Sequence, residues 1–166
     1  MILAIDPGPT ESALVRYDES ARKLVRGIKA QNDAVLAELV GYFAGGHSDP
    51  NDRPTLVVEM IASYGMPVGA EVFQTCVWIG RFVQAWLGEH VTITRGAVKL
   101  QICGSMRAKD GNVRAALIDR FGGKERAIGK KANKGPLWGV SGDVWAALAV
   151  AVTYAERTAY EVQRVA

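Results

Sequence analysis

Two acidic residues interrupt apolar segments of the sequence, at positions where a charge is costly. Asp6 closes the apolar run 1–5 and precedes a Pro-Gly-Pro turn, and Glu59 lies inside the β-branched run 54–61. Burying a lone carboxylate is expensive unless a cation or hydrogen-bond donors compensate its charge. Because each acid lies on a predicted strand, the pair indicates a shared site that holds a metal ion.

A third acid, Asp143, lies in the predicted first turn of the last helix, just before the small-residue stretch 146–151. Ser141 as the N-cap, with Asp143 in the first turn, would stabilise that helix by roughly 0.5 to 2 kcal/mol without any catalytic role. Together with Asp6 and Glu59, however, Asp143 completes a set of oxygen ligands of the kind that Mg²⁺ prefers.

The charge is distributed unevenly along the chain. Residues 95–134 carry eleven basic and three acidic side chains, a net charge of +8, whereas the remainder carries −5. Runs of charge are most often solvated faces, but a cationic band on a nearly neutral protein also suits a polyanion. Beside buried acids, the band favours DNA or RNA as the partner.

The elements that must position these residues follow from periodicity and turn signals. Three short strands at 2–6, 12–18 and 24–30 form a meander, and a helix over 31–44 follows. The later elements are a strand at 55–60, an amphipathic helix at 70–88, a strand at 91–94, a helix from Asp110 to Phe121 and a helix from Ser141 through Tyr154. Residues 122–135 are predicted to be a mobile basic loop. The pattern is that of a mixed α/β domain.

Length and composition agree with one domain over residues 1–166, with 49% hydrophobic and 22% charged residues. No apolar stretch approaches the ~20 residues that span a bilayer, and no leader precedes the first strand, so we expect a cytoplasmic protein without a membrane partner. Cys76 and Cys103 lie in apolar surroundings and are predicted to be reduced, buried thiols.

Four blocks in order resemble those of the RuvC-type Holliday-junction resolvases, especially their phage-like branch. The blocks are ILAIDPGPTESALV, LVVEMIASYG, VKLQICGSMRAKDGNVRAAL and GVSGDVWAALAVAVTYAER, and they span nearly the whole chain. The resemblance implies an RNase H-like fold with a mixed five-stranded sheet, a homodimer and Mg²⁺-dependent cutting of branched DNA. By position, Asp6, Glu59 and Asp143 match the metal carboxylates of the family, and Lys99 and Lys109 match basic positions associated with the DNA and the reacting phosphate.

The sequence departs from the family pattern at Val140. The family commonly has an acid or a histidine at this position, one helical turn before the last aspartate. Either a second metal ion has fewer protein ligands here, or Glu71, Glu11 or Asp110 supplies the missing oxygen. The family's junction-probing aromatic residue is also out of register. Tyr64 is a candidate substitute, although it could equally anchor its own loop.

The implied mechanism is phosphodiester hydrolysis with two Mg²⁺ ions, for which Mn²⁺ can substitute. Asp6 bridges the ions, Glu59 and Asp143 complete the ligand set, and Lys109 stabilises charge on the phosphate from the start of a helix. The expected DNA contacts are Lys99, Arg107, Lys109, Arg114, Lys130, Lys131, Lys134 and Tyr64. A merely surface phosphate contact is the alternative role for Lys109.

The helix over 70–88 carries apolar residues on more than one face, among them Phe73, Val77 and Trp86. A symmetric dimer would bury the excess, and burial within the monomer is the alternative.

Two other functions are compatible with the sequence. The departure at Val140 allows a noncatalytic protein that binds branched DNA. The Asp-Pro-Gly-Pro-Thr segment at 6–10 also resembles the phosphate loop of sugar kinases and actin-like ATPases. Those proteins need two such domains around a nucleotide, so 166 residues disfavour this last class.

Overall fold

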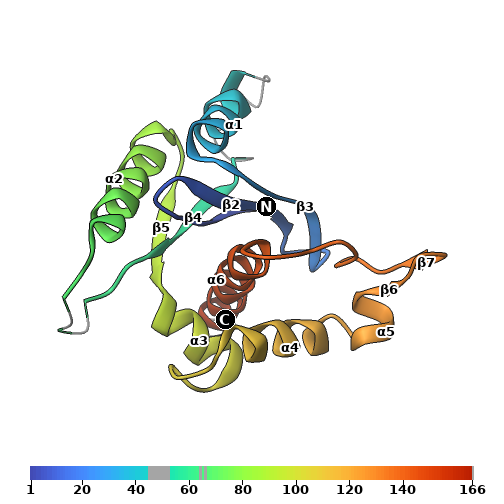
Figure 1. Ribbon diagram of the computed structural model, residues 1–166. Helices are drawn as coiled ribbons and strands as arrows, with labels where there is room; N and C mark the ends of the chain where they lie inside the picture. Colours follow the sequence, from blue (N-terminus) through green and yellow to red (C-terminus); the bar gives the residue numbers. More distant parts are fainter. Residues whose placement is uncertain (45–52, 64, 66, 166) are drawn as a thin grey trace.

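The computed structural model describes residues 1–44, 53–63, 65 and 67–165 (Figure 1). The strands and helices are, in chain order, β1 Ile2–Asp6, β2 Glu11–Asp18, β3 Lys23–Gln31, α1 Asn32–Ala44, β4 Thr55–Met60, α2 Ala70–Ala85, β5 His90–Thr94, α3 Arg95–Cys103, α4 Asp110–Arg120, α5 Lys124–Ala127, β6 Gly129–Lys130, β7 Asn133–Lys134 and α6 Val144–Val165.

Five strands form one mixed sheet in the order β3-β2-β1-β4-β5. The first three strands pair antiparallel, whereas β4 lies parallel to β1, and β5 lies parallel to β4. The carboxyl ends of β1, β4 and β5 therefore meet at one edge of the sheet, which is where α/β folds commonly carry their sites.

Alternating side chains of the central strands supply two separate cores, because successive residues of a strand face opposite sides of the sheet. Leu3 and Ile5 of β1 pack under α1 and α2, whereas Ile2 and Ala4 pack against α3, α4 and α6. Figure 1 shows the two groups of helices on opposite faces of the sheet. Asp6 continues the Ile2 and Ala4 series, so its carboxylate lies on the α6 face.

Helix α6 packs closely on the sheet because its contact face is made of small residues. Ala147 and Ala151, one helical turn apart on α6, are both fully buried. Gly27 of β3 also permits this approach, since a Cβ at that position would lie 2.6 Å from Cγ1 of Val144. The first turn of α6, which follows Asp143, is thereby fixed beside the sheet.

Most of the predicted elements are present, and three expectations were wrong. Helix α3 begins directly after β5 and was missed. Residues 122–135 are not an irregular loop, because they include α5 and the β6–β7 hairpin. Cys76 is exposed rather than buried, and Cys103 is half-buried. Within the described residues, no helix is both long and apolar enough to cross a membrane.

Candidate active site

Asp6 and Glu59 lie side by side because their strands are paired in parallel. The register aligns Ala4 with Val57 and Ile5 with Val58, so the next residues along the two strands are the two acids. Adjacent strands are about 4.8 Å apart. Glu59 is buried and faces the α6 side with Val57, as Asp6 does. The sheet thus brings together two carboxylates that are 53 positions apart in the sequence.

Asp143 reaches the same pocket from the start of α6. The preceding residue, Gly142, has a φ of 52°, a left-handed conformation that favours glycine, and it lines the pocket with Asp143. The backbone carbonyl of Asp143 accepts a hydrogen bond from the N–H of Ala147 at 3.0 Å. Its side chain is half-exposed and forms an ion pair with Nζ of Lys29 on β3 at 2.9 Å. The hydrogen bond with Asp143 raises the pKa of Lys29.

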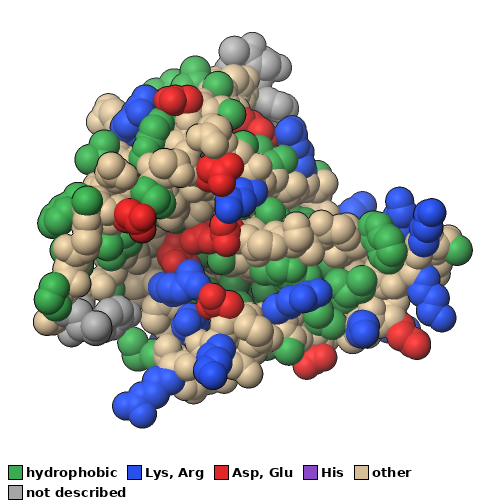
Figure 2. Space-filling view, in the orientation of Figure 1, with side chains coloured by type: hydrophobic (Ala, Val, Ile, Leu, Met, Phe, Trp, Pro, Cys, Tyr) green, Lys and Arg blue, Asp and Glu red, His purple; other side chains and the backbone are tan. Residues whose placement is uncertain are grey.

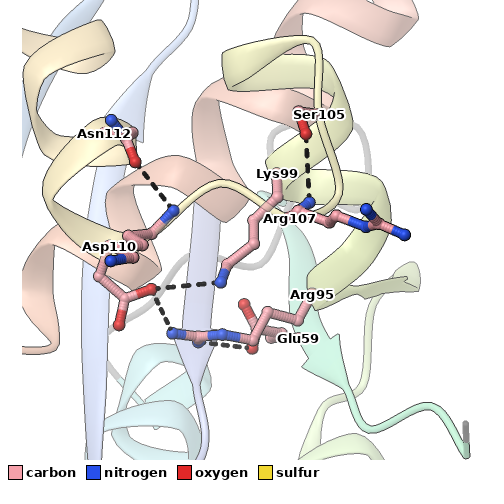
Figure 3. A network of polar contacts seen from close by, with 8 residues as sticks. Glu59, Arg95, Lys99, Ser105, Arg107, Asp110 and Asn112 are labelled. Atoms are coloured by element: carbon pink, nitrogen blue, oxygen red, sulfur yellow. Dashed lines mark hydrogen bonds and ion pairs between the residues drawn. The ribbon is translucent and has the colours of Figure 1, made fainter.

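A fourth carboxylate, that of Asp110, lines the pocket from the first residue of α4. Arg95, the first residue of α3, connects it to the sheet (Figure 3). Nη1 of Arg95 donates to Oε1 of Glu59 at 3.1 Å, and its Nη2 donates to Oδ1 of Asp110 at 2.9 Å. Nζ of Lys99 lies 3.5 Å from the same Asp110 oxygen. Arg95 and Lys99 are one helical turn apart, so α3 presents both cations to the acids.

Asp6 differs from the other three acids in having no ion pair with any described residue. Burial, reinforced by the negative charge of Glu59, raises the pKa of Asp6 to about 7. Burial also raises the pKa of Glu59, although Arg95 opposes that shift. The negative charge of Asp6 is therefore poorly compensated at the end of its strand. A cation bound beside it would offset the cost of burying that charge.

The chemistry of these donors suits a hard divalent cation, which takes carboxylate oxygens. Among the described residues, no three acidic, histidine or cysteine side chains converge as a ready-made metal site. Instead, Lys29 and Arg95 draw the carboxylates of Asp143, Glu59 and Asp110 toward themselves. The residues therefore fit a metal ion in their type and in their shared pocket, and ion binding requires these carboxylates to reorient.

The structure places the other predicted residues as follows. Lys99 lines the pocket, whereas Lys109 is exposed at the N-cap of α4 and is not among the pocket-lining residues. Arg107 is also exposed, and Arg114 lies over the Trp145 ring at 5.2 Å. Lys130, Lys131 and Lys134 are exposed at the β6–β7 hairpin. Tyr64 lies outside the described residues.

Of the three acids considered as replacements at Val140, Asp110 is the one that lines the pocket. Glu11 lies 3.5 Å from Lys29, and Glu71 lies in the first turn of α2. Val140 itself precedes α6 and lines a different groove, and its carbonyl accepts a hydrogen bond from Nε1 of Trp145 at 3.1 Å. The position one turn before Asp143 thus lies outside the acid pocket in this structure.

Arg95 is the charged pocket-lining residue that the sequence did not lead us to predict as part of the site. Its signal was its position directly after strand 91–94, which pairs in parallel beside the strand of Glu59. A cation at that point must lie at the same sheet edge as the acid.

The sheet and its acid edge define an α/β fold of the RNase H-like class. No protein-family model and no curated protein sequence matches the chain. Several solved structures match it, and two of them are structures of RuvC. The structure of Thermus thermophilus RuvC has 20% identity and a TM-score of 0.64, covering 93% of this chain and 92% of that chain. The structure of T. thermophilus RuvC in complex with a Holliday junction substrate has 17% identity and a TM-score of 0.60, covering 93% and 91%. The predicted fold class is confirmed: this chain has the RuvC-like fold.

Proposed function

We propose that this protein is a divalent-metal-dependent endonuclease that cuts four-way DNA junctions by paired nicks. The observation that carries the proposal is that Asp6, Glu59 and Asp143 all line one pocket, at the carboxyl ends of the parallel strands of a RuvC-like fold. One of the matching structures contains a Holliday junction substrate, which supports branched DNA as the substrate here. The finer assignment to the phage-like branch rests on the sequence blocks alone.

Asp6, Glu59 and Asp143 would hold the metal, with Asp110 as the added carboxylate in place of the residue missing at Val140. When bound, two Mg²⁺ or Mn²⁺ ions supply an activated water and stabilise the leaving 3′ oxygen. Asp6 lies beside Glu59 and has no ion pair with any described residue, so its carboxylate would be available to the metal. Reorientation of the acids frees Arg95 and Lys29 from their present partners.

Once the acids bind metal, the cations around the pocket would bind the scissile phosphate. Lys99 lines the pocket and approaches Asp110 from α3, so it can contact a phosphate bound between α3 and α4. Lys109 is exposed at the N-terminus of α4, where the helix dipole also attracts anions, and we assign it to the DNA backbone beside the cut. Developing negative charge on the phosphate is stabilised by such preplaced cations.

Paired nicking requires two active sites, and the outer face of α2 is our candidate dimer interface. Phe73 and Val77 lie one helical turn apart and are 62% and 63% exposed, whereas Ile79, Phe82 and Trp86 pack inward. Helix α2 therefore has exposed apolar side chains, as predicted, but they lie on one face of the helix. A symmetric dimer through this face would bury it and pair the two pockets.

The test is cleavage of a synthetic four-way junction in about 10 mM Mg²⁺ or Mn²⁺, comparing the wild type with Asp6→Asn and Glu59→Gln. Both variants should lose nicking by at least about a hundredfold while retaining junction binding, because the basic band provides most of the affinity. Glu71→Gln, an acid outside the pocket, is the matched control and should cut normally.

Two results would overturn the assignment. Wild-type cleavage rates in Asp6→Asn or Glu59→Gln would place the active site elsewhere. Junction binding by the wild type without nicking in either metal would favour the noncatalytic DNA-binding alternative.

A further inference from the structure

A second groove begins next to the acid pocket and runs away from it between β3 and the segment before α6. Residues 24–29 form one wall, and Pro136, residues 138–142 and Val144 form the other. Gly142 lines both the groove and the acid pocket, so the two are continuous beside Asp143. Arg26 and Lys29 line the groove, where Arg26 forms an ion pair with Glu38, and Lys29 forms ion pairs with Glu11 and Asp143. The positive charge without an ion pair lies beyond the groove, at the β6–β7 hairpin.

The β6–β7 hairpin extends this surface and is firmly built. Gly129 and Gly135 pack so closely that a Cβ on either would lie 2.2 Å from a backbone oxygen. The N–H of Gly135 donates to the carbonyl of Ile128 at 2.8 Å, and the N–H of Leu137 donates to the carbonyl of Ala127 at the same distance. Ala127 and Leu137 are fully buried. The hairpin is therefore anchored to the core on both sides.

The tip of the hairpin is strongly cationic. Residues 124–134 carry five basic side chains and one acid, a net charge of +4. Lys130, Lys131 and Lys134 are all exposed, and no ion pair involves them in the described part of the chain. Figure 2 shows lysine and arginine side chains gathered at the end of the molecule that β6 and β7 form in Figure 1. Such a surface lacks an internal counter-charge and matches a polyanion.

Trp138 lies between the hairpin and the groove. It is 40% exposed, whereas Trp86 and Trp145 are 4% and 7% exposed and pack in the two cores. Nζ of Lys134 lies 6.0 Å from the centre of the Trp138 ring. The fourth tryptophan, Trp78, is half-buried and packs against the core under α1 and α2. Trp138 is the exposed tryptophan of the described residues, and it belongs to neither core. An exposed indole ring on a cationic surface is the arrangement with which proteins stack unpaired nucleobases.

We propose that this groove carries the DNA strand that leaves the acid pocket, with Trp138 stacking on an unpaired base near the branch point. The exposed lysines of the hairpin contact the phosphates of the same strand. The inference rests on the proposed function, because it takes branched DNA as the ligand. It adds a second contact site for that DNA, at Trp138 and the groove that leads away from the acid pocket.

The experiment measures binding of a fluorescein-labelled synthetic four-way junction by anisotropy, in EDTA and over a range of salt concentrations. Trp138→Ala should weaken binding by roughly 5- to 150-fold without changing the salt dependence, and Trp138→Phe should restore most of the affinity. The triple variant Lys130→Ala, Lys131→Ala, Lys134→Ala should instead lower the slope of log K against log salt by up to about 2, because single-strand contacts contribute about 0.7 per phosphate.

Tyr160→Ala is the matched control. Tyr160 is also an exposed aromatic residue near a cation, with Cζ of Arg164 at 5.8 Å, but it lies near the other end of α6 among Glu156 and Glu161. This variant should bind the junction as the wild type does. Circular dichroism melts of each variant establish that its fold is retained.

Stacking itself is read out by placing 2-aminopurine at successive positions around the branch point. At one of these positions, wild-type protein should quench the fluorescence and Trp138→Ala should not. Junction binding by Trp138→Ala at wild-type affinity, or loss of binding that Trp138→Phe does not restore, would overturn the stacking role. Either result leaves the nuclease proposal standing, because that proposal is judged by metal-dependent nicking.

Discussion

Asp6 is a site of electrostatic strain in the metal-free protein, and replacing it with asparagine should stabilise the fold. The carboxyl has a pKa of about 7 in the folded protein against 3.8 for the unperturbed group, and burial is the largest cause. The folded state therefore binds this proton more tightly than the unfolded state does. A shift of this size corresponds to about 4 kcal/mol, of which we expect roughly 2 to 4 kcal/mol to be expressed for a group that water partly reaches.

Because the pKa of Asp6 is raised on folding, its ionisation lowers stability as the pH rises. At pH 4 and below, Asp6 is protonated in the folded protein and imposes no penalty. As the pH rises from about 4 to about 7, the carboxyl ionises in the unfolded chain first, so the free energy of unfolding falls. Above pH 7 the penalty is constant. Asp6→Asn should remove this component: its stability should match the wild type near pH 4 and exceed it by roughly 2 to 4 kcal/mol at pH 8.

The assay is thermal unfolding in EDTA at several pH values, where the variant should melt roughly 5 to 15 °C above the wild type at pH 8. Adding Mn²⁺ or Mg²⁺ should stabilise the wild type, because an ion that binds the folded state alone shifts the equilibrium. The same ions should stabilise Asp6→Asn much less. Asp33→Asn, which removes a carboxylate with an 81% exposed side chain on the opposite face, is the control with little effect. An Asp6→Asn protein that is no more stable than the wild type at pH 8 would refute the reasoning.

Three further predictions follow from the same structure. Asp110→Asn should raise the Mg²⁺ concentration for half-maximal nicking by several-fold and weaken Mn²⁺ binding measured by calorimetry, since Asp110 lines the pocket; unchanged values would remove it from the ligand set. The double variant Phe73→Glu, Val77→Glu should be a monomer by light scattering at micromolar concentration while its melting temperature is nearly unchanged, because both side chains are exposed; a wild-type monomer would end the dimer proposal. Gly27→Ala should destabilise the fold by about 1 to 3 kcal/mol in denaturant titrations, because its Cβ would lie against Val144.

Two of the three proposed metal ligands, which all line the pocket, were predictable from the sequence because each broke a local rule. Asp6 and Glu59 are charges in apolar strands, and a strand that is buried on both faces does not tolerate them without a reason. Asp143 was weaker, since a first-turn acid has an ordinary capping explanation. The positions of the strands along the chain also followed from local signals, because short apolar runs alternate with turn residues, whereas the mixed five-stranded sheet was predicted from the family resemblance.

The cations that partner these acids were not predictable to the same degree. Arg95 lies in a helix that begins directly after β5, with Thr94 serving both as the last strand residue and as the N-cap, where its Oγ1 accepts from the N–H of Ala97 at 3.3 Å. A strand and a helix without an intervening turn leave no boundary to detect. Asp110 was one of three acids considered as the replacement for the residue missing at Val140. The sequence could not choose among them, because it is the packing of α4 that places Asp110 at the pocket.

The β6–β7 hairpin and Cys76 were missed for other physical reasons. The hairpin depends on close backbone approach at Gly129 and Gly135, which is a tertiary contact with no periodic signature. Cys76 has apolar neighbours in the sequence, but it directly follows the buried Thr75, and successive helical residues are rotated by about 100°. Composition around a residue therefore does not decide which face of a helix it occupies.

If the proposed function is correct, the ion pairs of the pocket would couple metal binding to DNA binding. In the structure, Arg95 and Lys29 serve as counter-charges for the acids; Arg95 lines the acid pocket, and Lys29 lines the adjoining groove. A divalent ion that takes over the carboxylates releases the cations, and a phosphate that engages the cations releases the carboxylates. Each ligand thus lowers the cost of binding the other, and the coupling is reciprocal by thermodynamic necessity. On this proposal, DNA affinity without metal would come mainly from cations outside the pocket, such as those of the β6–β7 hairpin, which form no ion pair within the described part of the chain.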